Sequence, residues 1–462
     1  MNSPQIVWLR RDLRLCDHQA LTAAAEAGPV IPVYVLDDET PEARRMGGAS
    51  RWWLHHSLEA LAGDLGRHRS QLVLRRGRAA DVLAGLAEET GAGAVHAIRH
   101  YEPWWREAEE ELSERVTLCL HDGNYLLPPG TVTTGSGNPY KIYSPFRDAM
   151  REAIDGFDII PEPSLSGPDA WPEGDDLTDW GLLPAKPDWA GGMREFWDGQ
   201  FGMAAATERF DRFLGVVKDY GEDRNLPAED GTSRMSPHLH HGEVSPRMLW
   251  NAMSRHTNAG ANTFRNELIW RDYAQNVIQQ FPRYAEEPYR DGYDDNFWRN
   301  PDRGHLIADE LQAWQQGRTG YPIVDAGMRQ LWNAGWMHNR VRMIAASFLV
   351  KHLLIDWRHG EQWYWDCLVD ADYGNNGVNW QWISGTGVDS NMFVRIMAPL
   401  SQSEKFDAAD YIREWVPELA DLSDTQIHDP DDGCRPKDYP AKIIGHKEAR
   451  ERALETYRSS KR

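Results

Sequence analysis

Short runs of aliphatic and β-branched residues alternate with amphipathic helical stretches over about residues 5–125, and this rhythm constrains the possible folds most strongly. Residues 30–36 (VIPVYVL) and 71–74 (QLVL) have the composition of buried strands, whereas residues 52–65 have helical periodicity. Strands that are separated by helices pair in parallel within one sheet. The pattern therefore predicts a doubly wound α/β domain at the N-terminus.

Helical periodicity dominates from about residue 200 onward, with amphipathic segments expected at residues 202–219, 262–280, 321–334 and 340–352. Residues 160–192 are instead rich in Pro, Gly, Asp and Ser, a composition that buries too little apolar surface to fold alone. We therefore expect an α/β plus all-α chain. Its predicted parts are an α/β domain over residues 1–130, a connector over residues 131–200 and a helical domain over residues 201–462.

Composition narrows the class of protein. A chain of 462 residues suggests two or three domains. The four cysteines, Cys16, Cys119, Cys367 and Cys434, lie far apart and form no Cys-x-x-Cys pair, which argues against a disulfide framework. No secretory leader precedes the first strand pattern, and the apolar run at residues 344–355 is interrupted by charge. We expect a cytoplasmic protein that does not enter membranes.

The formal net charge of -21 counts against long-range attraction to nucleic acid, although a local basic patch remains compatible with it. Five histidines, at positions 55, 56, 238, 240 and 241, form short clusters. We find no acidic residue or cysteine at a ligand spacing around them, so no metal site is predicted.

Three segments could carry chemistry. Glu267, Trp270 and Arg271 share one helical face, as a binding surface or as a surface ion pair beside a core Trp. Asn339 and Met343 stack at i, i+4, where Asn suits a pyrimidine edge, although helix capping and core packing are equally open. Residues 230–237 gather hydroxyls before a helix start, which suits a phosphate or a plain cap.

The sequences of several motifs, and their order along nearly the whole chain, resemble those of the photolyase and cryptochrome family. These motifs are WLRRDLR at residues 8–14, GRTGYPIVDA at 317–326, GWMHNR at 335–340 and NWQW at 379–382. The resemblance implies an N-terminal antenna-type domain and a C-terminal helical domain that binds FAD.

The same resemblance implies roles for individual residues. Asn376 would face flavin N5, and FAD would be held by Tyr220, Thr232, Ser233, Arg234, Met235, Ser236, Arg342, Asp370, Ala371, Asp372 and Asn376. Trp380, Trp357 and Trp314 would relay electrons between the flavin and the surface. Glu267 and Asn339 would hydrogen-bond the substrate in a pocket walled by Trp270, Met343 and Trp382, and DNA would also be contacted by Arg224, Arg271, Arg340, Arg395 and Gln402.

The implied activity is light-driven DNA repair, in which reduced, excited FAD passes an electron to a flipped-out cyclobutane pyrimidine dimer. Asn339 and Met343 resemble the cyclobutane dimer enzymes, whereas (6-4) photolyases have a histidine-rich helix there. Alternatives are a (6-4) photolyase, a cryptochrome-type blue-light receptor and a nucleotide-binding module without photochemistry. Asn376 and the absence of a long C-terminal tail favour repair.

Two further expectations concern cofactors and partners. Residues 100–105 (HYEPWW) resemble the corresponding sequence of deazaflavin-binding members. The antenna site is therefore expected to hold deazaflavin or methenyltetrahydrofolate, or to be empty. UV-damaged DNA is the expected partner, and a monomer without an obligate protein partner is the expected state.

Overall fold

The computed structural model describes residues 3–390 and 392–460. The chain folds into two compact units, which we call the sheet unit and the helical unit. The sheet unit comprises the residues up to Ala190, Trp197–Val217 and Ser233–Pro282. The helical unit comprises Gly191–Phe196, Lys218–Thr232 and the residues from Arg283 on.

The sheet unit contains a parallel five-stranded sheet in the order β3-β2-β1-β4-β5. Its strands are β1 (Gln5–Leu9), β2 (Val30–Leu36), β3 (Val73–Arg76), β4 (Ala94–Ile98) and β5 (Leu118–His121). The intervening helices are α1 (Gln19–Ala27), α2 (Gly48–Arg67), α3 (Ala79–Thr90) and α4 (Pro103–Ser113). The prediction of a doubly wound α/β fold is therefore confirmed.

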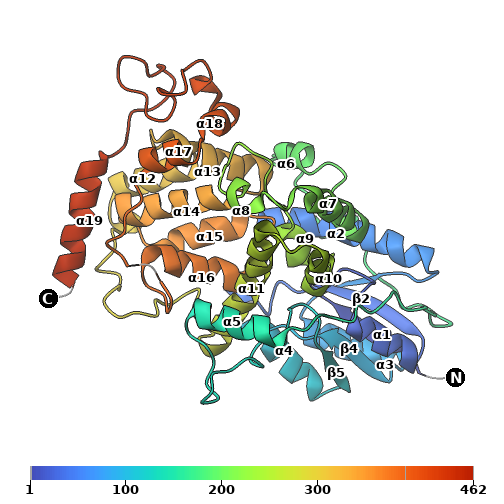
Figure 1. The fold of residues 1–462 in the computed structure, drawn as a ribbon. Coiled ribbons are helices and arrows are strands. Elements are labelled where there is room, and N and C mark those ends of the chain that lie inside the picture. Colours follow the sequence, from blue (N-terminus) through green and yellow to red (C-terminus); the bar gives the residue numbers. More distant parts are fainter. Residues whose placement is uncertain (1–2, 391, 461–462) are drawn as a thin grey trace. The chain divides into compact units, whose positions relative to one another are not determined.

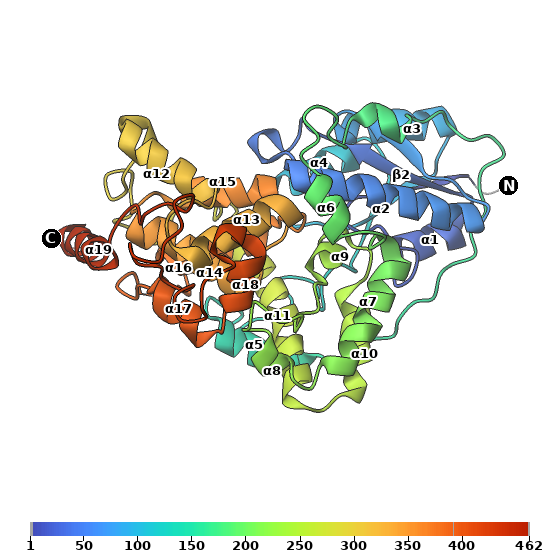
Figure 2. The same ribbon diagram turned by 90° about the horizontal axis from the view of Figure 1, so that it is seen from above.

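Alternation along β1 produces two separate cores, one on each face of the sheet. Val7 and Leu9 belong to a cluster that includes Leu54 and Leu58 of α2. Ile6 and Trp8 point to the other face, and their cluster contains side chains from α3 and α4. Helices accordingly cover both faces, as Figure 2 shows around β2.

Further helices complete the sheet unit. They are α5 (Tyr143–Ala153), α7 (Gly202–Val216), α9 (Ser236–His241), α10 (Pro246–Ala252) and α11 (Ala259–Gln280), with short 3-10 turns at Glu42–Arg44, Leu177–Trp180 and Met253–Arg255. The expected helices at residues 202–219 and 262–280 correspond to α7 and α11. The segment predicted as a connector contains α5, and Figure 1 shows this helix beside α11.

The helical unit has no strand among its described residues. Its helices are α6 (Gly191–Phe196), α8 (Tyr220–Asp223), α12 (His305–Gln315), α13 (Pro322–Ala334), α14 (Asn339–Ser347), α15 (Trp357–Cys367), α16 (Tyr373–Ser384), α17 (Pro399–Lys405), α18 (Ala409–Trp415) and α19 (His446–Ser460). A π-helical turn, Phe348–His352, continues α14, and 3-10 turns occur at Pro301–Arg303 and Pro417–Leu419.

The two units do not coincide with the sequence-based division at residues 130 and 200. Helices α7, α9, α10 and α11 follow residue 200, but they belong to the sheet unit. The ranges 1–130, 131–200 and 201–462 stay a prediction. Across the described residues, no helix combines the length and apolar composition needed to span a bilayer.

Candidate active site

A pocket in the helical unit lies between α14, α16 and the segment that joins α15 to α16, and we call it the Asn376 pocket. It has a volume of about 120 Å³. Nine residues predicted for the site line it together: Asn339, Arg342, Met343, Asp370, Ala371, Asp372, Asn376, Trp380 and Trp382. Residues separated by up to 43 positions in the sequence thus meet in one cavity.

Arg342 brings a fixed positive charge to this pocket. Its two terminal nitrogens donate to the two carboxylate oxygens of Asp370 at 3.1 and 3.0 Å, and its Nε donates to the Met337 carbonyl at 2.8 Å. Asp370 is almost fully buried, whereas Arg342 keeps 23% of its side chain exposed. A bidentate pair of this kind holds the guanidinium plane in one orientation. The expected proximity of Arg342 to Asp370 is confirmed.

Asn376 offers the pocket an acceptor. Its Nδ2 donates to the backbone oxygen of Glu361 at 3.0 Å and to the Glu361 carboxylate at 2.9 Å. Both partners are acceptors, which fixes the orientation of the amide. The carbonyl oxygen of Asn376 therefore remains for a ligand. Asp372 is committed to the cap of α16, where it accepts from the backbone N–H of Asn375 at 2.7 Å.

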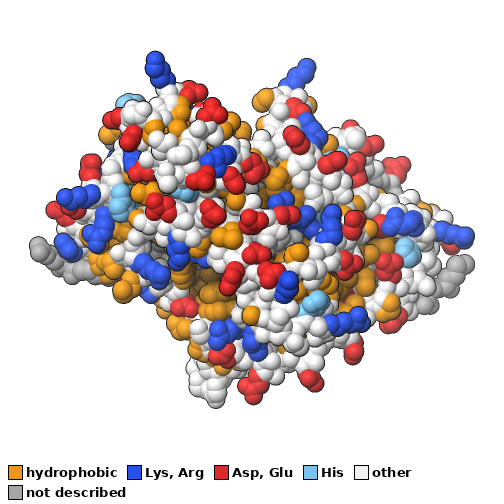
Figure 3. Space-filling model, turned by 45° about the horizontal axis from the view of Figure 1, so that its top comes forward, with side chains coloured by type: hydrophobic (Ala, Val, Ile, Leu, Met, Phe, Trp, Pro, Cys, Tyr) orange, Lys and Arg blue, Asp and Glu red, His pale blue; other side chains and the backbone are white. Residues whose placement is uncertain are grey.

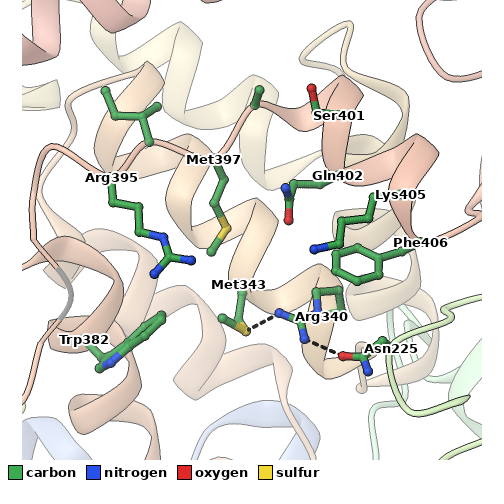
Figure 4. Close-up of a pocket in the computed structure, with 12 residues that line it drawn as sticks. Asn225, Arg340, Met343, Trp382, Arg395, Met397, Ser401, Gln402, Lys405 and Phe406 are labelled. Carbon is green, nitrogen blue, oxygen red and sulfur yellow. Dashed lines mark hydrogen bonds between the residues drawn. The ribbon is translucent and has the colours of Figure 1, made fainter. Parts of the chain in front are cut away.

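A second pocket, of about 660 Å³, also lies in the helical unit (Figure 4), and we call it the Arg340 pocket. Its lining includes three cations, Arg340, Arg395 and Lys405, and no carboxylate among the described residues. Met343 and Trp382 line both pockets, so the two cavities share a wall. Gln402, which was predicted to contact DNA, lies here as well.

The guanidinium of Arg340 is held from several sides. It donates to the side-chain oxygen of Asn225 and to the sulfur of Met343, the latter at 3.7 Å. Its central carbon lies 4.7 Å from the ring centroid of Phe406. Figure 4 shows these contacts at the edge of the cavity. Neither Asn225 nor Phe406 was predicted as a site residue.

Asn339 begins α14 with an exposed side chain. The described residues offer its amide no hydrogen-bond partner, so its donor and acceptor are open to a ligand in the Asn376 pocket. The cap of α14 comes from His338, which accepts from the backbone N–H of Arg340 at 3.2 Å. The capping alternative therefore applies to His338, and Asn339 keeps its predicted binding role as a proposal.

In the sheet unit, α11 carries Glu267, Trp270 and Arg271, all of intermediate exposure. The guanidinium of Arg271 donates to the backbone oxygens of Asn124 and, at 3.3 Å, of Leu239. Its central carbon also lies 4.7 Å from the Tyr125 ring centroid. These contacts fasten the loop after β5 to α11, a structural role that the sequence did not indicate.

Asp272 follows on the same helix and is fully buried. Burial raises the pKa of its carboxyl to about 7, against the opposing effects of Arg271 and of two backbone donors. Those donors are the N–H groups of Leu126 at 2.9 Å and Leu127 at 3.3 Å. Asp272 thus holds the same loop as Arg271.

The loop at residues 230–236 crosses the boundary between the units, which falls between Thr232 and Ser233. Arg234 has a left-handed backbone (φ 48°), and Met235 is buried. The hydroxyl of Ser233 accepts from the Met235 N–H at 3.3 Å, as in a local cap, and Ser236 begins α9. In the helical unit, Tyr220 is buried with Arg224 over its ring at 5.4 Å.

Comparisons with known proteins decide the family. Residues 5–164 match the family description "DNA photolyase", and residues 264–459 match "FAD binding domain of DNA photolyase". The chain belongs to the DNA photolyase family. FAD is the cofactor of that domain, and the Asn376 pocket suits it chemically, with a fixed guanidinium for an anionic reduced flavin and an acceptor for a flavin N–H.

Several members of the photolyase family are similar to this chain over nearly their full length. A deoxyribodipyrimidine photo-lyase of Agrobacterium fabrum is 43% identical, covering 100% of this chain and 98% of the relative. That of Escherichia coli is 34% identical over 99% of each chain. A crystal structure described as a bacterial class III photolyase from Agrobacterium tumefaciens has a TM-score of 0.93 and 42% identity, covering 100% and 98%.

The fold alone does not separate photolyases from cryptochromes. A crystal structure of a Synechocystis cryptochrome has a TM-score of 0.87 and 26% identity over 99% of each chain. The distinction between repair and reception therefore depends on the pockets and on the names of the more similar relatives.

Two of the three tryptophans that were predicted to relay electrons in this photolyase pack close together in the helical unit. Trp380 and Trp314 lie with ring centroids 6.4 Å apart, and Tyr364 packs against both, at 5.0 and 6.0 Å. Trp357 and Trp314 are fully buried. Trp314 also donates its indole N–H to the Ala345 carbonyl at 2.9 Å. Trp314 is thus wholly enclosed, and its part in an electron relay stays a prediction.

Substitution tests the inner part of this route. We expect Trp380→Phe to slow photoreduction of oxidised flavin by at least about tenfold, because the ring nearest the pocket loses its easily oxidised indole. Repair by chemically reduced protein should remain within about twofold. Flash photolysis with an added electron donor measures the first property, and normal photoreduction in this variant would exclude Trp380 from the route.

Two residues of α15, Gly360 and Glu361, position side chains of α16 at the pocket. A Cβ on Gly360 would lie 2.1 Å from the Trp380 ring, so only glycine permits α15 to approach α16 this closely. Glu361, the next residue, is wholly buried and orients Asn376. A carboxylate on the buried stripe of a helix was the sequence signal that could have identified Glu361.

One possible metal cluster was overlooked in the sequence. The ligand atoms of His55, His56 and Glu59 lie within 4.8 Å of one another on α2. Glu59 stands four residues after His55, so the statement that no acidic residue recurs at a ligand spacing was wrong. The absence of a metal site stays a prediction.

Proposed function

We propose that this protein is a deoxyribodipyrimidine photo-lyase, an enzyme that splits cyclobutane pyrimidine dimers in DNA under blue light. The observation that carries the proposal is the Arg340 pocket. Three cations and no carboxylate line its described part, although the chain has a net charge of -21. Figure 3 shows acidic side chains spread over the displayed face, with Lys and Arg between them. A cationic cavity on such a surface suits a phosphate-bearing ligand.

The shared wall of the two pockets favours a base rather than a phosphate alone. Met343 and Trp382 supply a soft and a flat apolar surface to both cavities. A volume of about 660 Å³ falls within the range typical of ligand pockets. Photolyases are among the enzymes that extrude their target nucleotides from the duplex. The Arg340 pocket would receive the extruded dimer.

When bound and reduced, FAD supplies on excitation an electron that opens the cyclobutane ring, and it takes the electron back once the two pyrimidines have separated. The residues of this chain position the reactants. Arg342 would balance the negative charge of the reduced cofactor, and the Asn376 oxygen would accept from flavin N5–H. Asn339 would hydrogen-bond the pyrimidine edge, and such bonds strengthen once a ligand excludes water. For Glu267, in the sheet unit, the same role is proposed from the family resemblance alone. Met343 and Trp382 would pack on the bases, and the family resemblance alone proposes a packing role for Trp270 of the sheet unit.

The remaining cofactor contacts are also proposals. The hydroxyls and backbone donors of Thr232, Ser233 and Ser236 suit the FAD pyrophosphate, and Arg234, Met235 and Tyr220 flank them in the sequence. Ala371 and Asp372 line the Asn376 pocket. An antenna, as deazaflavin or methenyltetrahydrofolate, is proposed near residues 100–105, where Glu102 is buried and paired with Arg11 at 2.5 Å.

Location and assembly belong to the same proposal. The described residues contain four free cysteines and no bilayer-spanning helix, which supports a reducing, cytoplasmic environment. A monomer acting on UV-damaged DNA without an obligate protein partner is proposed. Sedimentation of the purified protein with and without DNA tests this assembly state.

Arg340→Ala should weaken binding to a damaged duplex and lower the slope of log affinity against log salt by about one unit. The reason is the loss of one phosphate contact beside Arg395 and Lys405. Titration at several salt concentrations measures both quantities. Arg318→Ala, which removes an exposed arginine outside the pocket lining, is the matched control and should change neither. An unaltered slope in Arg340→Ala would place this arginine away from DNA.

The type of dimer is tested directly with two oligonucleotides, one carrying a cyclobutane dimer and one carrying a (6-4) photoproduct. We expect illuminated, reduced protein to repair only the first. Repair of the (6-4) product alone would replace this proposal with the (6-4) photolyase alternative. Bound flavin without repair of either lesion would favour the receptor alternative.

A further inference from the structure

Trp270 has one of its two ring faces covered by a residue from the segment predicted as a connector. The ring of Tyr143, on α5, stacks on Trp270 with centroids 3.3 Å apart and planes 7° from parallel. The Tyr143 hydroxyl donates to the Asn266 carbonyl at 3.1 Å. Tyr273 packs edge-on against both rings, at 5.6 and 5.5 Å. The indole is therefore held in one plane.

Hydrogen bonds fasten residues 140–151 of this segment to α11, the helix that carries Trp270. Tyr273 donates its hydroxyl to the Lys141 carbonyl at 2.8 Å, and Asn276 donates to the Tyr140 carbonyl at 2.8 Å. Arg151, in the last turn of α5, donates to the side-chain oxygen of Asn266 at 2.9 Å. Figures 1 and 2 both show α5 beside α11. The two helices thus form one rigid support.

The exposure of Trp270 distinguishes this stack from ordinary core packing. Trp8, Trp52 and Trp53 of the same unit are fully buried, whereas Trp270 keeps intermediate exposure although Tyr143 beneath it is buried. One face of the indole is occupied, so only the opposite face can take another flat ring. A partly exposed indole with a rigid backing is suited to stacking on a base.

We propose that Tyr143 is a positioning residue that fixes Trp270 as a base-stacking platform for the damaged dinucleotide. This inference rests on the proposed function of the chain as a dimer-repairing enzyme. Preorganisation of the indole avoids the ordering of a large side chain when DNA binds. The backing should therefore raise affinity for the lesion, and it should leave affinity for undamaged DNA unchanged, because an intact duplex keeps its bases stacked inside.

The test compares dissociation constants for a duplex with one cyclobutane dimer and for the same duplex undamaged. We expect Tyr143→Leu to reduce the preference for the lesion by about threefold to tenfold, the range for freeing one large side chain. Tyr143→Phe keeps the flat ring and should stay within about twofold of wild type. The photon yield at saturating substrate and the FAD content should be unchanged in both variants.

Phe146→Leu is the matched control for loss of a buried aromatic ring on α5. Phe146 packs on Tyr273 and Tyr140, with no ring contact to Trp270. Its preference should equal that of wild type at whatever thermal stability it retains. Tyr143→Met, which keeps volume without a flat ring, replaces Tyr143→Leu if the latter does not fold.

The outcomes separate two failures. An unaltered preference in Tyr143→Leu, or an equal loss in Phe146→Leu, would overturn the positioning role while wild-type preference for the lesion still supports repair. Absence of any preference in the wild type would overturn the proposed function and this inference with it. Loss of preference in Trp270→Ala together with normal preference in Tyr143→Leu would leave Trp270 as a platform that needs no backing.

Discussion

We expect Arg342→Ala to retain less than about a tenth of the wild-type FAD after purification, as the ratio of flavin to protein absorbance will measure. The substitution removes the cation of the Asn376 pocket and leaves the nearly buried Asp370 carboxylate unpaired beside the cofactor. Breaking a buried pair by deleting one partner typically costs about 3–5 kcal/mol, because the other charge stays uncompensated. The loss should therefore appear both in cofactor affinity and in thermal stability.

Asp370→Asn provides the control for this prediction. It removes the negative charge while Arg342 still donates to the Met337 carbonyl, so we expect partial retention of FAD. Adding Asp370→Asn to Arg342→Ala should restore stability more than FAD content, since the lone carboxylate is gone but the cation is still missing. Full FAD retention in Arg342→Ala would remove Arg342 from the cofactor site.

We expect Glu267→Ala to lower the repair yield per absorbed photon by about tenfold at saturating substrate, with FAD content unchanged. Removing one group that stabilises developing charge in an active site commonly costs tenfold or more. Glu267→Gln keeps a polar group of similar length that can hydrogen-bond the substrate, and should lose less. The measurement is the number of dimers split per photon absorbed by the reduced protein.

Asn262→Ala, at an exposed position on the same helix, is the control and should repair normally. A normal yield in Glu267→Ala would exclude this carboxyl from the chemistry. A reduced yield with reduced FAD content would instead show that Glu267 acts through the fold of its unit.

The fold followed closely from local patterns. Alternation along β1 assigns Ile6 and Trp8 to one face and Val7 and Leu9 to the other, so helices on both faces could be predicted from residues adjacent in the sequence. The expected pairing of Arg342 with a carboxylate was also confirmed, since its partly exposed guanidinium makes a bidentate contact with the nearly buried Asp370.

The missed residues act through contacts between distant positions. Asn225 reaches Arg340 over 115 positions, and Tyr143 stacks on Trp270 from a segment whose composition indicated only a connector. Periodicity describes which face of a helix is buried, not which other helix covers it. The burial of Trp314 could not be predicted for a related reason, since spacing does not reveal that its indole is wholly enclosed.

Reduced FAD in this chain is proposed to split a cyclobutane dimer that is held beside it. A photorepair assay measures this reaction directly. Purified protein is reduced, mixed with an oligonucleotide containing one thymine cyclobutane dimer, and illuminated with blue light while thymine absorbance is followed against a dark control. We expect absorbance to recover in the light only. A dimer that survives illumination while reduced flavin is bound would contradict this expectation.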